Sequence, residues 1–180
     1  MKKMNKWLGA AAIAALGAIV CTTSCKKDKV QEATDSSIAQ QEMAATVDPY
    51  RQANEAFIDS IGKVEGVHSL GAGISYRVLT EGHGPKPTGE STVRVHYEGK
   101  LIDGNVFDSS YERHEPAEFP VGGVIEGWQY ALKAMPAGSK WEVYIPWYYA
   151  YKETGSGASI PPYSALVFTI ELLDVLSNPA

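Results

Sequence analysis

Most of the residues whose types could do chemistry lie in four short segments. They are residues 95–99 (VHYEG), 106–110 (VFDSS), 124–128 (VIEGW), and 160–162 (IPP) followed closely by 166–168 (LVF). They supply aromatic rings, branched aliphatic side chains and the aspartate Asp108. Aromatic walls with an indole floor suit a flat apolar ring, although the same rings are also typical of an ordinary core. The segments therefore predict either a non-covalent binding pocket or the packed interior of a domain.

Other chemistries lack their sequence signatures. Both cysteines, Cys21 and Cys25, lie within the first 25 residues, so the remainder has no thiol nucleophile, disulfide or cysteine-based zinc site. The four histidines show no metal-ligand spacing. The sequence has no glycine pattern typical of phosphate or dinucleotide binding, and residues 155–157 (GSG) lack the hydrolase elbow pattern. A net charge of −5 gives a nucleic-acid partner no electrostatic support. We therefore expect no metal, no cofactor and no nucleic acid.

Alternating and helical patterns indicate the elements that would position these segments. Short connections between alternating stretches predict an antiparallel sheet packed on one helix, which is an α+β arrangement. Pro136 and Gly138 would end that helix, and Asp103-Gly104 is typical of a tight turn. The predicted strands lie in residues 74–78, 93–97, 141–145 and 166–172 and around Phe119, and the predicted helix is residues 124–135.

In this order and spacing, the four segments resemble the FKBP-type peptidyl-prolyl cis-trans isomerases. The resemblance covers about residues 74–175 and is closest to the bacterial secreted, lipoprotein branch of the macrophage infectivity potentiator type. It implies an antiparallel sheet of five to six strands wrapped around one short helix, with an apolar pocket between sheet and helix. It also implies an isomerase (rotamase) with a non-covalent mechanism, whose partners are proline-containing unfolded or partly folded polypeptides.

The resemblance assigns a role to each residue of that pocket. Trp128 would form the floor, and the walls would include Phe107. The backbone N–H of Ile125 and the hydroxyl of Tyr151 would donate to substrate carbonyls. Asp108 would accept a hydrogen bond from a wall tyrosine and face the carbonyl carbon of the amide. The implied catalytic residues are Tyr97, Phe107, Asp108 and Tyr151, and the implied substrate-binding residues are Val124, Ile125, Trp128 and Phe168.

Three positions depart from the family pattern. Ala117 stands where many members have a wall phenylalanine, which predicts a more open pocket on that side. Lys152 stands where a glycine usually follows the pocket tyrosine, and residues 147–149 (WYY) are more aromatic than usual. These departures concern the rim of the pocket more than its chemistry. The aromatic cluster of residues 144–151, which includes this run, is interpreted as pocket rim, with a glycan or peptide platform as the alternative.

The N-terminal part divides into three segments ahead of the isomerase-like domain, residues 66–180. Residues 1–25 show the charged, apolar and small-residue zones of a secretory signal. They resemble a bacterial lipoprotein signal with Cys25 as the lipid attachment site, and a plain cleaved signal peptide is the alternative. Residues 26–47 are polar and predict a flexible tether. Residues 48–65 predict a short amphipathic helix that either packs on its own domain, the favoured interpretation, or serves as a helix for homodimerisation or for clamping client polypeptides.

These observations together lead to one functional prediction. We expect a lipid-anchored isomerase that assists protein folding in the bacterial cell envelope and faces the periplasm or the exterior. The alternatives are a catalytically weak peptide-binding chaperone module on the same fold and, less in keeping with the segments, a surface lipoprotein that binds glycans.

Overall fold

In the computed structural model, which describes residues 48–177, seven strands form one antiparallel sheet. The strand order is β1-β2-β6-β7-β3-β4, and β5 also pairs with β3. Because β4 pairs with the second half of β3 and β5 with its first half, these two short strands share one edge of β3. The strands are β1 (His68–Gly71), β2 (Ile74–Thr80), β3 (Thr92–Leu101), β4 (Val106–Ser109), β5 (Ala117–Pro120), β6 (Lys140–Ile145) and β7 (Leu166–Ser177).

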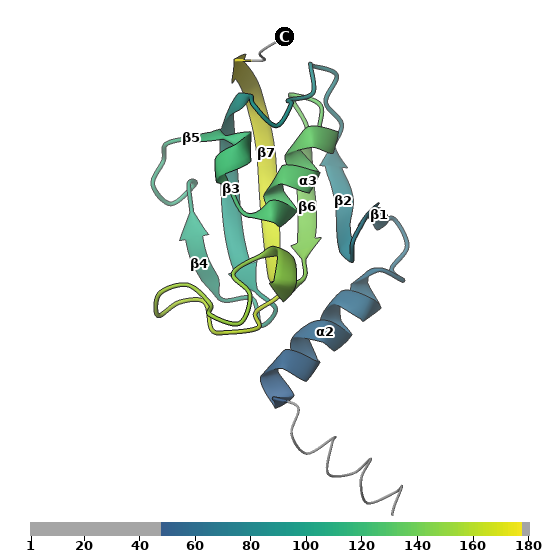
Figure 1. Cartoon of the computed structure of the whole chain (residues 1–180). Coiled ribbons are helices and arrows are strands. Elements are labelled where there is room, and N and C mark those ends of the chain that lie inside the picture. Colours follow the sequence, from purple (N-terminus) through teal and green to yellow (C-terminus); the bar gives the residue numbers. More distant parts are fainter. Residues whose placement is uncertain (1–47, 178–180) are drawn as a thin grey trace, which may run out of the picture. The chain divides into compact units, whose positions relative to one another are not determined.

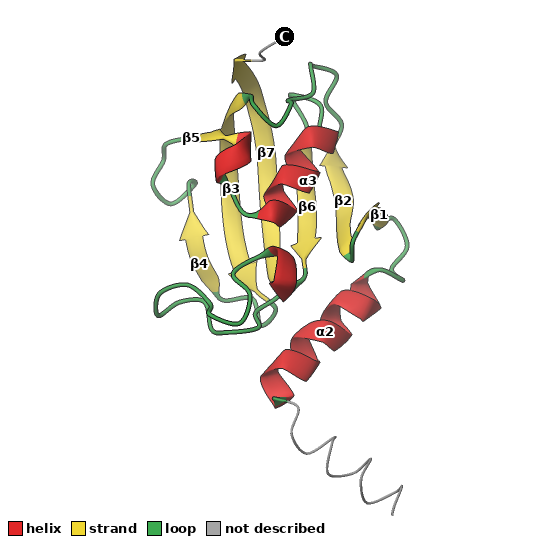
Figure 2. Cartoon of the chain, in the orientation of Figure 1, coloured by secondary structure: helices red, strands yellow, loops and turns green. Residues whose placement is uncertain are grey.

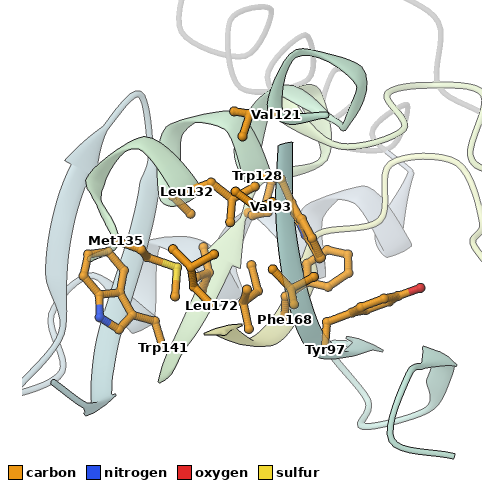
Figure 3. Packing of buried hydrophobic residues seen from close by; sticks show 14 of the residues in the cluster. Val93, Tyr97, Val121, Trp128, Leu132, Met135, Trp141, Phe168 and Leu172 are labelled. Carbon is orange, nitrogen blue, oxygen red and sulfur yellow. The ribbon is translucent and has the colours of Figure 1, made fainter. Parts of the chain in front are cut away.

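The helix α3 (Glu126–Ala134) lies across one face of this sheet (Figures 1 and 2). Strands β3 and β7 bury alternate residues beneath it, because successive side chains of a strand point to opposite faces. Side chains from β3, α3, β6 and β7 point toward one another in this layer (Figure 3). Its fully buried members include Val93, Val95, Leu132, Met135, Val143, Ile170 and Leu172. The predicted α+β architecture is thus confirmed.

Two strands and one helix start differ from the sequence prediction. β1 and β4 are only four residues long, too short for an alternating pattern to stand out. The predicted break at Gly71 and Gly73 is a tight connection between β1 and β2. The central helix begins at Glu126, because residues 121–123 form the short 3-10 helix η1 (Val121–Gly123) and the next two residues are extended. This extended stretch carries Val124 and Ile125.

The predicted N-terminal helix is present as α2 (Pro49–Ile61). Asp48 caps it by accepting a hydrogen bond from the backbone N–H of Tyr50 at 2.9 Å, and Pro49 takes the first helical position. Phe57 of α2 packs edge-on against Tyr144 of β6, with ring centroids 6.3 Å apart. The helix therefore packs on its own domain.

The predicted signal, the tether and Cys25 lie outside the described residues. None of the helices in residues 48–177 combines the length and the apolar character that crossing a bilayer would require.

Candidate active site

A cavity of about 350 Å³ opens between the N-terminal end of α3, the strands β3, β4, β5 and β7, and the loop after β6. All eight residues that the sequence analysis placed in a pocket line it. Two further residues, Phe119 and Gly123, line it as well. The complete lining is Tyr97, Phe107, Asp108, Phe119, Gly123, Val124, Ile125, Trp128, Tyr151 and Phe168.

Trp128 forms the centre of an aromatic cluster in this cavity. Its side chain is only 4% exposed. Three rings meet it edge to face, with centroid distances of 5.3 Å to Tyr97, 5.8 Å to Phe119 and 5.2 Å to Phe168. Phe107 in turn meets Phe168 at 5.6 Å. Edge-to-face packing fixes each ring against its neighbour, so the cavity has a rigid apolar floor and walls.

Phe119 supplies the wall that the sequence analysis left open at Ala117. Both residues belong to β5 and are two apart, so they lie on the same face of the strand. The ring of Phe119 contacts Tyr97 at 5.9 Å and also reaches Trp128. The expectation of a more open pocket on this side neglected this second residue of the strand. The period-2 pattern of residues 117–119 was the signal that could have identified it.

The close approach of two walls depends on Gly99. This residue of β3 pairs with Asp108 on one side and with Phe168 on the other. A Cβ at this position would lie 2.5 Å from Phe107 Cζ and 2.7 Å from Phe168 Cε1, well inside van der Waals contact. Only glycine therefore lets these two rings meet across β3.

One edge of the cavity is polar and carries an ionised carboxylate. The hydroxyl of Tyr97 donates to Asp108 Oδ2 at 2.5 Å. Arg113 Nη2 donates to the same hydroxyl at 2.9 Å, and Arg113 Nη1 also donates to Asp108 Oδ1. Partial burial opposes ionisation of Asp108, but the hydrogen bonds from Tyr97 and Arg113 outweigh it and hold the pKa of Asp108 below its ordinary value. Burial and the bond to Asp108 raise the pKa of Tyr97.

Arg113 was not among the residues predicted from the sequence. It follows the VFDSS segment in an irregular stretch, where sequence patterns give no side-chain direction. Its guanidinium lies 5.5 Å from the centre of the Tyr97 ring, which adds a cation–π contact to the two hydrogen bonds. Tyr97, Asp108 and Arg113 thus form one connected group.

We expect Arg113→Gln to raise the pKa of Asp108, because the substitution removes a positive charge and a strong donor. Because the pKa of Asp108 is lowered in the folded protein, the stabilisation from its hydrogen bonds with Tyr97 and Arg113 is complete above the pKa that the carboxyl has in the unfolded chain. It is lost as the pH falls through the folded pKa. In the variant this loss begins at a higher pH. A ¹³C NMR titration of the Asp108 carboxyl measures the shift. Arg94→Gln, which breaks the ion pair with Glu118, is the control and leaves the titration unchanged. An unchanged midpoint in Arg113→Gln would contradict the interpretation.

Besides the buried Nε1 of Trp128, two further hydrogen-bond donors in the cavity have no partner within residues 48–177. They are the backbone N–H of Ile125 and the hydroxyl of Tyr151. Ile125 is the N-cap of α3, and N–H groups at the N-terminus of a helix have no acceptor within the helix. Burial, and then the charge of Asp108, raise the pKa of Tyr151, so its hydroxyl keeps its proton at neutral pH. Both groups can donate to carbonyl oxygens of a bound molecule.

The rim departures have structural explanations. Lys152 adopts φ 57°, a left-handed conformation that favours glycine. The backbone shape is therefore kept although the residue type differs, and Lys152 Nζ pairs with Glu126 at 3.1 Å. Residues 147–149 form the short 3-10 helix η2 (Trp147–Tyr149). These three rings are not among the residues that line the cavity.

Comparisons with known proteins agree with this geometry. The family described as FKBP-type peptidyl-prolyl cis-trans isomerase matches residues 84–173. The chain is 58% identical over 120 residues to the FKBP-type 22 kDa peptidyl-prolyl cis-trans isomerase of Escherichia coli (strain K12), which covers 67% of this chain and 58% of that protein. It is 43% identical over 121 residues to the outer membrane protein MIP of Legionella longbeachae, covering 67% and 52% of the two chains.

A solved structure shows the same likeness. The peptidyl-prolyl cis-trans isomerase of Pseudomonas syringae pv. tomato aligns with a TM-score of 0.67 and 41% identity, over 72% of this chain and 98% of that one. The chain spans about half the length of the curated relatives it matches. The resemblance found in the sequence is therefore confirmed, and the chain belongs to the FKBP-type peptidyl-prolyl cis-trans isomerase family.

Proposed function

We propose that this protein is a peptidyl-prolyl cis-trans isomerase that acts on proline-containing unfolded or partly folded polypeptides without a covalent intermediate. The observation that carries the proposal is the cavity around Trp128. It combines an indole floor, aromatic walls and hydrogen-bond donors without partners, among them the N–H of Ile125 and the hydroxyl of Tyr151. A prolyl ring is flat and apolar, so it fits such a floor.

The reaction needs a pocket rather than a nucleophile. Rotation about an amide C–N bond has a barrier of about 18–20 kcal/mol, because resonance must be lost. At X-Pro bonds both isomers are populated, and uncatalysed exchange takes tens to hundreds of seconds. The twisted amide has less charge separation than the planar one, so an apolar and dry site disfavours the planar form more. This difference lowers the barrier.

The polar groups of the cavity would hold the substrate while the bond rotates. The N–H of Ile125 and the hydroxyl of Tyr151 would donate to carbonyl oxygens of the polypeptide backbone. These bonds would fix the chain so that the twist falls on the prolyl bond. The ionised Asp108, held by Tyr97 and Arg113, would face the carbonyl carbon of the rotating amide.

The direct test is the exchange of a proline tetrapeptide, followed with catalytic amounts of the full chain. We expect the cis-to-trans relaxation rate to rise in proportion to protein concentration above the uncatalysed rate. A folded protein that binds the peptide and leaves this rate unchanged would contradict the proposal. That result would favour the peptide-binding chaperone module instead.

We also propose a place for the protein in the bacterial cell envelope, held to a membrane through a lipid on Cys25. The support is the charged, apolar and small-residue pattern of residues 1–25 and the printed name of the relative called outer membrane protein MIP. Self-association through residues 48–65 stays a prediction.

A further inference from the structure

The helix α2 contacts the loop that carries Tyr151 at the point where this loop begins. The loop comprises residues 146–165 and connects β6 with β7. Its second residue, Trp147, donates from Nε1 to Glu55 Oε1 at 3.1 Å. The Glu55 side chain is 41% exposed, and its bond to Trp147 links α2 to the near end of the loop.

The same helix also holds the far end of the loop. The backbone N–H of Ala165 donates to Asn54 Oδ1 at 2.8 Å. One residue earlier, the hydroxyl groups of Ser164 and Tyr50 share a hydrogen bond of 2.9 Å. Asn54 is completely buried, and its Nδ2 donates to the backbone oxygen of Tyr50 at 2.8 Å. Both halves of its side-chain amide are therefore bonded, which fixes its orientation.

Arg51 of α2 joins the two ends of the loop. Its guanidinium lies 4.9 Å from the ring centre of Trp147 and 5.3 Å from that of Tyr163. The two rings themselves meet edge to face at 5.1 Å. Glu55 holds the guanidinium in place at 2.8 Å. The two ends of the loop therefore meet in one small cluster. It consists of Trp147 and Tyr163 from the loop and of Arg51 and Glu55 from α2.

We propose that α2 positions the cavity loop, with Asn54 as the main positioning residue. The inference goes beyond the proposed function, because it assigns a role to a helix that contributes no residue to the cavity lining. Asn54 does not line the cavity. It acts indirectly, by holding the loop in the conformation that places Tyr151 in the cavity lining, which we call the closed loop.

The proposal predicts a specific kinetic signature. If the loop opens in a fraction of the molecules, only the closed fraction binds, and apparent affinity falls by that fraction. A substrate that binds the closed loop still turns over normally. Loss of the contacts between α2 and the loop therefore raises KM and leaves kcat unchanged. A merely destabilised fold has fewer active molecules, which lowers kcat at constant KM.

We expect Asn54→Ala, made in the full chain, to raise KM for a proline peptide about five- to tenfold, in keeping with the loss of a buried hydrogen bond. Amide hydrogen exchange of residues 152–165 should accelerate by at least this factor, whereas exchange in β3 stays unchanged. Tyr50→Phe removes only the bond to Ser164 and should give a smaller change of the same kind. This second variant keeps the test valid if Asn54→Ala fails to fold.

Phe57→Ala is the matched control. It shortens a partly buried residue of the same helix that packs on Tyr144 of β6 instead of the loop. We expect wild-type KM and loop exchange in this variant. Equal effects from Phe57→Ala, or wild-type KM and loop exchange in both Asn54→Ala and Tyr50→Phe, would overturn the proposal. Hydrogen exchange needs no turnover. It therefore tests whether α2 positions the loop even if the wild-type protein proves inactive as an isomerase.

Discussion

Phe107→Ala is expected to lower kcat/KM for a proline tetrapeptide by roughly 10- to 100-fold. Phe107 is a wall of the cavity and meets Phe168 edge to face at 5.6 Å. Contact of an apolar side chain of this size with a buried ring contributes about 1.5–3 kcal/mol, which corresponds to that range of rates. Because Phe107 is only partly buried, the fold should survive its removal. The measurement is the initial rate of cis-to-trans exchange, with circular dichroism to verify the fold.

Val106→Ala is the control for this prediction. Val106 is the neighbouring residue of β4, is 42% exposed and is absent from the cavity lining. Its truncation removes a smaller apolar group from the same strand, at a position outside the cavity lining. We expect its kcat/KM to stay within about twofold of the wild-type value, since exposed substitutions of this kind have small effects. Full activity in Phe107→Ala would show that the cavity wall has been wrongly assigned.

Gly99→Ala should damage both stability and activity. The new methyl group would overlap Phe107 and Phe168, and Phe168 is only 4% exposed, so its ring has little room to move. Overpacking of this type costs about 1–3 kcal/mol in the free energy of unfolding. The displaced rings are also the cavity walls, so kcat/KM should fall about tenfold or more. Urea denaturation and the tetrapeptide assay measure the two effects.

A double-mutant cycle separates the clash from other effects of the substitution. In the Phe107→Ala background one of the two overlapping rings is gone, so Gly99→Ala should destabilise the protein less than it does in the wild type. Gly89→Ala is the matched control, because a Cβ there meets no other atom within 4 Å. Equal destabilisation by Gly99→Ala in both backgrounds would contradict the close approach of Phe107 and Gly99.

The sequence predicted the parts of this fold that depend on periodic burial. β3 alternates buried and partly exposed residues from Thr92 to Lys100, and β7 does so from Leu166 to Leu172, so their patterns are visible without a structure. The start of α2 was predicted correctly because a cap and a proline act locally at Asp48 and Pro49. By contrast, β4 has only four residues, and its place in the sheet depends on pairing with β3.

The parts of the site that escaped prediction depend on contacts between distant residues. Arg113 reaches Tyr97 from sixteen positions away, and Asn54 bonds to Ala165 across 111 positions. No local pattern specifies such pairs. Seven of the eight predicted cavity residues lie in the four motifs that resemble a family, and Tyr151 was assigned through the same resemblance from outside them. Residue type alone left the core interpretation of Trp128 and Phe168 open.

The central claim is that a prolyl ring binds over the Trp128 indole while its amide bond rotates. The most direct measurement is a set of intermolecular nuclear Overhauser effects between a proline tetrapeptide and the protein, recorded under conditions of catalysed exchange. We predict contacts from the prolyl ring protons to the indole of Trp128 and to the ring of Phe168. Catalysed exchange with prolyl contacts only to residues outside this cavity would contradict the account.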